Sequence, residues 1–288
     1  MPLDNFQKQV AKIIAPNRTV NSPIAGGSMI QRHAFRLSDD ADIFVKDEDV
    51  HALFQADKAL LESKGLYVEK TKEYDGFIEA IVSASDDDPM GVTNLQWVRE
   101  GLNGFFPAIK DDEVGFRLHF ADLAVNKLLA CAGRKEPRDF VDMWMIDQNA
   151  LPMWRVALAA PGKDIRWSPE SIVEKVASNM VFSRHEFEQE VDLLIDLDPA
   201  ELLRDLTASI EFAREMLPQV NVFAHGRLGV RQGQVVSDRD QVDGTSWIDI
   251  AAGGNAELSG MNDDNLIQPI INKYGIDGSR ITDSLTFP

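Results

Sequence analysis

Cysteine is nearly absent from the sequence, since Cys131 is the only one among 288 residues. A single cysteine excludes an internal disulfide, and a chain without disulfides suits a reducing compartment. The opening MPLDNFQKQV also lacks the charged-then-apolar order of a secretion signal. We therefore expect a cytoplasmic location.

Long apolar runs are missing and basic residues are scarce. No apolar run approaches the roughly 18 residues of a transmembrane helix, so we expect no membrane partner. The 29 lysines and arginines stand against 47 aspartates and glutamates, which gives a formal net charge of −18. A surface of this charge repels nucleic acid and argues against an extensive RNA interface.

Hydrophobic residues make up 44% of the chain, enough for a packed core. Their spacing predicts an α/β (α+β) fold in three parts. Residues 1–120 predict a domain with a mixed sheet, residues 121–218 a helical domain that completes the active site, and residues 219–288 a hairpin and loop-rich segment. The expected helices cover residues 4–15, 28–34, 48–64, 121–133, 138–149, 168–180, 183–197 and 199–217. The expected strands cover residues 22–25 and 35–46 and three β-rich runs, GLYVEK, GFIEAIVSAS and GVTNLQWVRE.

An acidic strand stands out in the stretch AGGSMIQRHAFRLSDDADIFV, residues 25–45. In a strand, side chains two positions apart point the same way, with α-carbons roughly 6.5–7 Å apart. The alternation therefore places Arg36, Ser38, Asp40 and Asp42 on one face. Two carboxylates on one face are suited to hard cations such as Mg²⁺ or Mn²⁺, which prefer oxygen ligands.

Two glycines precede this strand. Gly26 and Gly27 allow the backbone to approach a phosphate closely. If Ser28 opens a helix, its free amides face the anion and its hydroxyl adds a donor. The alternative is a tight turn followed by an acidic strand edge, and each motif alone is common. Their combination at this spacing favours phosphate binding beside a metal site.

The order Gly-Gly, then Asp-x-Asp, resembles the DNA polymerase β-like nucleotidyltransferases. The chain is most similar to the AbiEii/AbiGii-type nucleotidyltransferase toxin family, to which the MenT toxins belong. Two later segments fit that family's motifs: DLAVNKLLACAGR offers Asp122 and Lys127, and RDFVDMW offers Arg138, Asp139 and Asp142. The resemblance covers residues 20–150 by motif and continues to Pro218 in layout only.

This resemblance implies transfer of a nucleoside monophosphate from a nucleoside triphosphate to a hydroxyl acceptor. The acceptor is left open between a tRNA end, a protein and a small molecule, and an antitoxin protein is an implied partner. In this assignment Asp40 and Asp42 are the metal ligands, and the catalytic group also includes Lys127 and Asp142. The nucleotide-binding residues are Gly26, Gly27, Ser28, Arg36, Ser38, Lys127 and Arg138.

Helical spacing gives an independent view of the later motifs. Arg138 and Asp142 lie four positions apart on one helix, so they are expected to share a face. A short turn between two helices would aim Lys127 and Arg138 at one site, where a lysine charge suits a triphosphate. The alternative is a set of salt bridges that only holds the helices together.

A third carboxylate is not obvious. In the polymerase β-like enzymes it comes from a later strand and helps deprotonate the attacking hydroxyl. The matching strand, VTNLQWVRE, carries Gln96 on the relevant face, and Glu79 of GFIEAIV is the nearest acid on another strand. This departure favours a second reading, a nucleotide-binding or interaction module with weak or no catalysis.

A local basic cluster interrupts the acidic sequence and consists of Arg117, Lys127, Arg134, Lys135 and Arg138. If RNA is the acceptor, we expect this cluster to bind it locally, at an exposed end, with a shallow salt dependence. The alternative is ordinary ion pairing within the protein.

Overall fold

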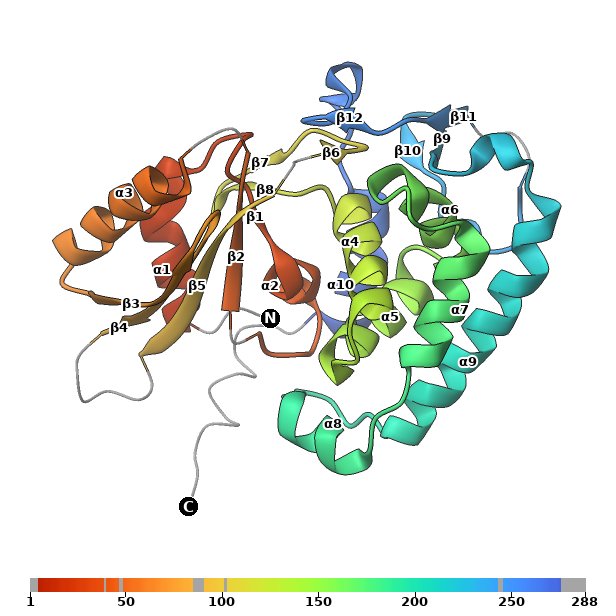
Figure 1. The fold of residues 1–288 in the computed structure, drawn as a ribbon, viewed down its shortest axis with the longest axis horizontal. Helices are drawn as coiled ribbons and strands as arrows, with labels where there is room; N and C mark the ends of the chain where they lie inside the picture. Colours follow the sequence, from red (N-terminus) through yellow and green to blue (C-terminus); the bar gives the residue numbers. More distant parts are fainter. Residues whose placement is uncertain are drawn as a thin grey trace.

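The computed structural model describes residues 5–38, 40–46, 49–84, 91–100, 103–242 and 246–275. A sheet with its covering helices forms one side of the molecule, and a bundle of helices forms the other (Figure 1). The expected mixed α/β architecture is therefore confirmed. None of the helices in the described part of the chain is long and apolar enough to cross a membrane.

The main sheet has seven strands in the order β3-β4-β5-β2-β1-β8-β7. The central strand β2 runs parallel to β5 and antiparallel to β1, so the sheet is mixed. The strands are β1 (Ile24–Ala25), β2 (Asp40–Val45), β3 (Tyr67–Tyr74), β4 (Phe77–Ser83), β5 (Val92–Arg99), β7 (Ile109–Asp111) and β8 (Gly115–Arg117).

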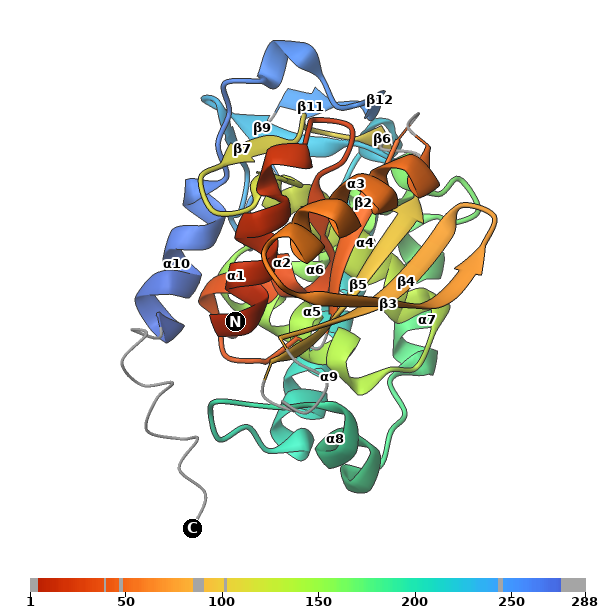
Figure 2. The same cartoon turned by 90° about the vertical axis from the view of Figure 1, so that its left-hand side faces the viewer.

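Two helices cover one face of this sheet, as Figure 2 shows: α1 (Asn5–Ile14) and α3 (Val50–Ser63). The buried residues of β2, which are Ala41, Ile43 and Val45, alternate with half-buried ones. Ile43 lies beside Trp97 of β5, and the Trp97 indole donates a hydrogen bond to a side chain of α3. The alternating pattern therefore turns the other β2 residues, Asp40, Asp42 and Phe44, toward the helical part.

A buried polar cluster fastens α3 to the sheet. The Asp57 carboxylate accepts hydrogen bonds from Arg18 at 2.6 Å, from Asn17 at 2.8 Å and from Trp97 at 2.7 Å. The side chains of Arg18 and Asp57 are both fully buried. A buried charge that loses its partner is costly, so this cluster is a sensitive point of the fold.

We expect Asp57→Ala to lower the free energy of unfolding by about 3–5 kcal/mol, because it leaves the Arg18 guanidinium buried without its carboxylate. Chemical denaturation measures this loss. Asp75→Ala is the matched control: Asp75 pairs with Arg99 at 3.0 Å, but its side chain is 94% exposed. The control should change stability by about 0.5 kcal/mol or less. Equal effects of the two substitutions would contradict the prediction.

The opposite face of the sheet meets α2 (Gly26–Ile30) and the helical part, in which α4 packs against α5, α6 and α7. The helices of this part are α4 (Phe120–Gly133), α5 (Pro137–Asn149), α6 (Met153–Lys163), α7 (Pro169–Asn179), α8 (Arg184–Glu190) and α9 (Pro199–Met216). Two small sheets follow the order β10-β9-β11 and β12-β6. Their strands are β6 (Asn103–Gly104), β9 (Leu228–Arg231), β10 (Gln234–Val235), β11 (Ser246–Ile248) and β12 (Ala251–Ala252).

Two expected elements were wrong, and one helix was missed. The helix expected over residues 183–197 ends at Glu190, because the next segment pairs with residues 35–37: Leu194 N–H bonds to Phe35 O at 2.7 Å. Helix α6 was not assigned from the sequence, although it lies in the part that was expected to be helical. Helix α10 (Asp264–Tyr274) also lies within the segment expected to be loop-rich.

Candidate functional site

The glycine step lies directly beside the acidic strand. β1 ends at Ala25, α2 begins at Gly26, and Gly26 has φ of +76°. A Cβ at Gly26 would stand only 1.9 Å from Oδ2 of Asp42, and one at Gly27 would stand 2.6 Å from Nη2 of Arg36. Glycine is thus required here both by backbone conformation and by the close approach of two charged side chains.

Strand β2 begins at Asp40, later than expected. Asp40 and Asp42 share one face, and they lie beside Asn94 and Gln96 of β5. Arg36 and Ser38 precede the strand, so their expected place on its face was wrong; the backbone there bridges to Leu193 instead.

Ser38 nevertheless lies at the site. Its hydroxyl donates to the backbone oxygen of Asp40 at 3.1 Å and to Oδ1 of Asp40 at 3.3 Å.

Ser28 does not open the helix, because α2 already begins at Gly26. Its side chain is fully buried, and its hydroxyl donates to the carbonyl of Ala25 at 3.2 Å. Ser28 therefore stabilises the turn from β1 into α2, and the expectation that it opens the helix was wrong. Its binding to a phosphate stays a prediction. Gly26 and Gly27 themselves line the cavity described below.

A buried ion network lies across from the carboxylates, on α4 and α5. Lys127 Nζ lies 2.7 Å from Oδ1 of Asp139 and 2.8 Å from Oδ2 of Asp142. Arg36 Nε lies 2.8 Å from Oδ1 of Asp142, and Gln31 Nε2 donates to the same oxygen at 2.8 Å. Asp142 therefore joins the residues before β2 to the helical part.

Burial would by itself raise the pKa of Asp142, but the charges of Arg36 and Lys127 outweigh that effect and lower it to about 2. Burial likewise disfavours the charge of Lys127, yet the carboxylates of Asp142 and Asp139 raise its pKa. The network is consequently fully ionised at neutral pH.

Arg138 does not pair with Asp142, so the alternative of an ion pair between these two residues was wrong. Its Nη2 lies 2.8 Å from Glu136, while Asp142 is occupied by Arg36 and Lys127.

The other cations of the basic cluster are paired as well. Arg134 binds Asp139 at 2.6 Å, and Arg117 binds Asp263 at 2.6 Å near α10. Only Lys135 of the cluster has no carboxylate partner within the described ranges. The cluster is therefore mostly internal ion pairing and not an open basic surface.

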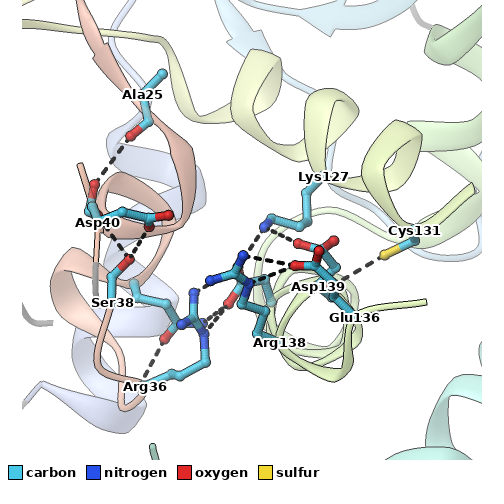
Figure 3. Close-up of polar contacts among 12 residues, drawn as sticks. Ala25, Arg36, Ser38, Asp40, Lys127, Cys131, Glu136, Arg138 and Asp139 are labelled. Carbon is cyan, nitrogen blue, oxygen red and sulfur yellow. Dashed lines mark hydrogen bonds and ion pairs between the residues drawn. The ribbon is translucent and has the colours of Figure 1, made fainter. Parts of the chain in front are cut away.

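These elements enclose one cavity of about 240 Å³. Figure 3 shows Ser38 and Asp40 on one side and Lys127, Arg138 and Asp139 on the other. The lining includes Gly26, Gly27, Arg36, Asp40, Asp42, Phe44, Gln96, Asn126, Lys127, Arg134, Arg138 and Asp139. Of the expected site residues, only Ser28, Ser38 and Asp142 are missing from this lining, and each of them bonds to a neighbour of the cavity wall.

The carboxylate pair is electrostatically unfavourable as it stands. Burial and then the charge of Asp40 raise the pKa of Asp42 to about 7, although Lys127, Arg134 and Arg138 oppose this. Two neighbouring carboxylates repel each other when both are ionised, and a cation bound between them would relieve that repulsion. The oxygen donors of Asp40 and Asp42 therefore fit a hard divalent ion. No group of three or more His, Cys, Asp or Glu side chains suited to a metal is found among the described residues.

We expect Mg²⁺ affinity to depend on pH near neutrality. With its pKa at about 7, Asp42 must lose a proton to become a ligand. Affinity should therefore be constant well above that pH and fall about tenfold for each pH unit below it, because one proton is displaced. Titration calorimetry from pH 8 to pH 5.5 measures this. Asp42→Asn serves as control and should show weak, pH-independent binding; a flat profile for the unaltered protein would contradict the assignment.

The position beside Asp42 that would carry a third carboxylate holds Gln96. Glu79 of β4 lies opposite Gln96 and accepts a hydrogen bond from its amide at 3.2 Å. A hydrogen bond from Lys72, at 2.9 Å, lowers the pKa of Glu79 and makes it a weaker base. Glu79 thus lies one strand beyond the cavity wall and is already paired.

Comparisons with known proteins bear on the fold. No protein-family model matches the chain, and no curated protein matches it. Among solved structures, MenT4, a nucleotidyltransferase toxin from Mycobacterium tuberculosis H37Rv, aligns with a TM-score of 0.54 at 15% identity, over 73% of this chain and 82% of its own. The chain has a nucleotidyltransferase fold.

Two Helicobacter pylori structures also align. JHP933 has a TM-score of 0.47 and 16% identity over 76% of this chain and 96% of its own. A second one has a TM-score of 0.47 and 17% identity over 74% of this chain and 94% of its own.

Within this nucleotidyltransferase fold, sequence reasoning missed several residues at the cavity. Asp139 was noted in its motif but given no role, although it binds both Lys127 and Arg134. Its place one helical turn before Asp142 is a signal that could have found it. Gln31 reaches Asp142 from 111 positions away, and no local pattern indicates such a contact.

Proposed function

We propose that this protein is a nucleotidyltransferase that moves a nucleoside monophosphate from a nucleoside triphosphate to a hydroxyl, with release of pyrophosphate. One observation carries the proposal. A single cavity joins the Asp40–Asp42 pair, the backbone at Gly26 and Gly27, and four cationic side chains. Anion-binding groups beside a carboxylate pair are what phosphoryl transfer requires.

In this proposal the carboxylates bind the metal ion, and the glycine backbone and the cationic side chains bind the phosphates. Asp40 and Asp42 would hold Mg²⁺ or Mn²⁺, which in such sites activates an attacking oxygen and neutralises charge on the leaving one. Gly26 and Gly27 offer backbone groups to the phosphates. Among the residues that the structure describes, Arg138 has the half-buried Glu136 as its only carboxylate partner, so it is the cation best able to turn toward a triphosphate.

The ion network plays a positioning role in this proposal. Lys127 contributes positive charge to the cavity wall, but Asp139 and Asp142 already hold it in place. Arg36 is fixed by the same Asp142. A preorganised set of charges does not need to rearrange as the transition state forms, which favours catalysis.

The acceptor stays open between a tRNA end, a protein hydroxyl and a small molecule. The pairing of Arg117 and Arg134 within the protein leaves little free basic surface near the cavity, which argues against a broad RNA interface. A role as a toxin with an antitoxin partner is a further proposal that rests on the resemblance alone.

A second candidate function is a nucleotide-binding module with weak or no catalysis. Gln96 favours it, since an amide cannot take a proton from an attacking hydroxyl. The Asp40–Asp42 pair argues for the enzyme, because a site that has lost catalysis is expected to lose its metal ligands early.

The deciding experiment incubates the full chain with each α-labelled nucleoside triphosphate, Mg²⁺, and separate pools of tRNA, protein and small hydroxyl compounds. The nucleotidyltransferase proposal is supported if the unaltered protein transfers label to one of the pools and the Asp40→Asn variant does not. Mg²⁺-dependent nucleotide binding without any transfer supports the second candidate. Absence of both binding and transfer would overturn the proposed function.

A further inference from the structure

A second cavity, of about 430 Å³, adjoins the one described above and shares Phe44 and Asn126 with it. Residues from β2, α4 and the end of α6 line it, together with Glu100 beyond β5 and Asn103–Gly104 of β6. The two cavities lie side by side on neighbouring faces of α4, because Asp122, Asn126 and Leu129 line the second one and Leu123, Asn126, Lys127 and Ala130 line the first. The combined space is within the range of small-molecule sites, which is roughly 300–1,000 Å³.

The two cavities differ in charge. Four cationic side chains and three carboxylates line the first, whereas two cationic side chains and three carboxylates line the second. The cations of the second cavity are also neutralised: Lys163 lies 2.8 Å from Asp122, and Arg166 lies 2.7 Å from Asp164. Phosphates are therefore favoured in the first cavity, and an uncharged polar group in the second.

Two polar groups of the second cavity are left to bind a ligand. Asn126 accepts a hydrogen bond from Lys163 through Oδ1 at 2.8 Å, so its NH₂ group remains to donate. The Glu100 carboxylate has no hydrogen-bond or ion-pair partner within the described ranges. The nearby protein raises the pKa of Glu100 by desolvation, against the opposing charge of Lys163. An acceptor and a donor beside the Phe44 ring match the edge and face of a nucleobase.

The geometry of an in-line displacement also favours the second cavity for the nucleoside. In an in-line displacement, the attacking and leaving oxygens lie on opposite sides of the phosphorus. The glycine step lies on the β1 side of β2, and Gln96 lies on the β5 side. With the leaving phosphates at the glycine step and the acceptor on the Gln96 side, the line from leaving to attacking oxygen would run across the strands. The nucleoside oxygen is attached to the same phosphorus away from this line, and Phe44 is the next residue along β2 on the same face.

We propose that the second cavity holds the nucleoside end of the donor nucleotide, and that the Glu100 carboxylate accepts N–H hydrogen bonds from its base. This inference rests on the proposed function, because it takes the first cavity as the triphosphate site. Glu100 is then a specificity-determining residue that distinguishes bases by their N–H donors.

The test compares two kinds of ligand by titration calorimetry in Mg²⁺: the four nucleoside triphosphates, and inorganic tripolyphosphate, which has no nucleoside. Glu100→Gln keeps the shape but removes the charge, and it should weaken the preferred nucleotide about tenfold. Val20→Trp fills the cavity from its rim, where Val20 is 51% exposed, and should weaken all four nucleotides. Neither variant should change tripolyphosphate binding by more than about twofold, because its charges lie in the other cavity.

Val222→Trp is the matched control, since Val222 is 74% exposed and lines neither cavity; it should change nothing. Nucleotide binding unaltered in both cavity variants would overturn the second subsite while the phosphate site stands. An equal loss of tripolyphosphate binding would also overturn it. If the unaltered protein binds neither ligand, the proposed function itself fails, and the subsite fails with it.

Discussion

Replacing Asp40 or Asp42 by asparagine is expected to abolish nucleotide transfer while the fold remains intact. Both side chains face the same cavity, and neither makes an ion pair within the described ranges. A bound metal supplies several kcal/mol of charge stabilisation in such reactions, and each 1.4 kcal/mol is a factor of ten in rate. The loss of either ligand should therefore reduce transfer by about 10³ or more. Labelled product per unit time measures this.

The same substitution at Asp42 should stabilise the metal-free protein. Its pKa lies at about 7 in the fold against an ordinary 3.8, so the native state binds the proton more tightly than the unfolded chain does. The contribution of Asp42 to the free energy of unfolding is therefore greatest below about pH 4, and it is lost as the pH rises toward 7. Asparagine cannot ionise, so the Asp42→Asn variant lacks this destabilisation at high pH. Its melting temperature at pH 8 should therefore exceed that of the unaltered protein.

Two measurements distinguish a loss of catalysis from a loss of folding. A variant that loses transfer because it unfolds would show a lower melting temperature, opposite to the expected rise. Asp49→Asn is a suitable control, because Asp49 caps α3 through its bond to the His51 amide and lines neither cavity. It should keep full transfer. Undiminished transfer in both Asp40→Asn and Asp42→Asn would exclude the catalytic assignment.

Much of the site could be predicted because its parts are local in sequence. The period of two in β2 places Asp40 beside Asp42 on one face, and the glycines come directly before that strand. Burial alternates along β2 as the sequence pattern predicts. Local periodicity also gave α4 and α5 to within one residue at each end.

The partners of each charge could not be predicted in this way. Asp142 binds Arg36 across 106 positions, whereas the helical spacing favoured Arg138 on its own helix. Helical spacing predicts which side chains share a face, but it does not predict which of them are buried together. A buried carboxylate is stabilised only by cations that are buried beside it, and these can come from distant parts of the sequence. Burial also explains the contact of Ser28. Because its hydroxyl is buried, it needs a hydrogen-bond partner within the protein, and it donates to the carbonyl of Ala25.

Lys127→Ala is expected to be among the most destabilising substitutions in the chain. The lysine side chain is only 9% exposed and lies between two fully buried carboxylates, Asp139 and Asp142. Removing one partner from a buried ion pair costs about 3–5 kcal/mol, since the remaining charge stays in a poorly solvated place. Chemical denaturation should record a loss of that size. Lys135→Ala, at an exposed neighbouring lysine, should change stability by about 0.5 kcal/mol or less.

The double variant Lys127→Met with Asp139→Asn separates structure from function. It removes the lysine charge and one of the carboxylates that depend on it, so much of the lost stability should return, giving a clear coupling between the two positions. Nucleotide binding should not return, because the cavity wall still lacks the Lys127 charge. Recovery of stability together with binding would show that Lys127 only holds the helices together. Normal stability of Lys127→Ala alone would contradict the ion network as the reason for its burial.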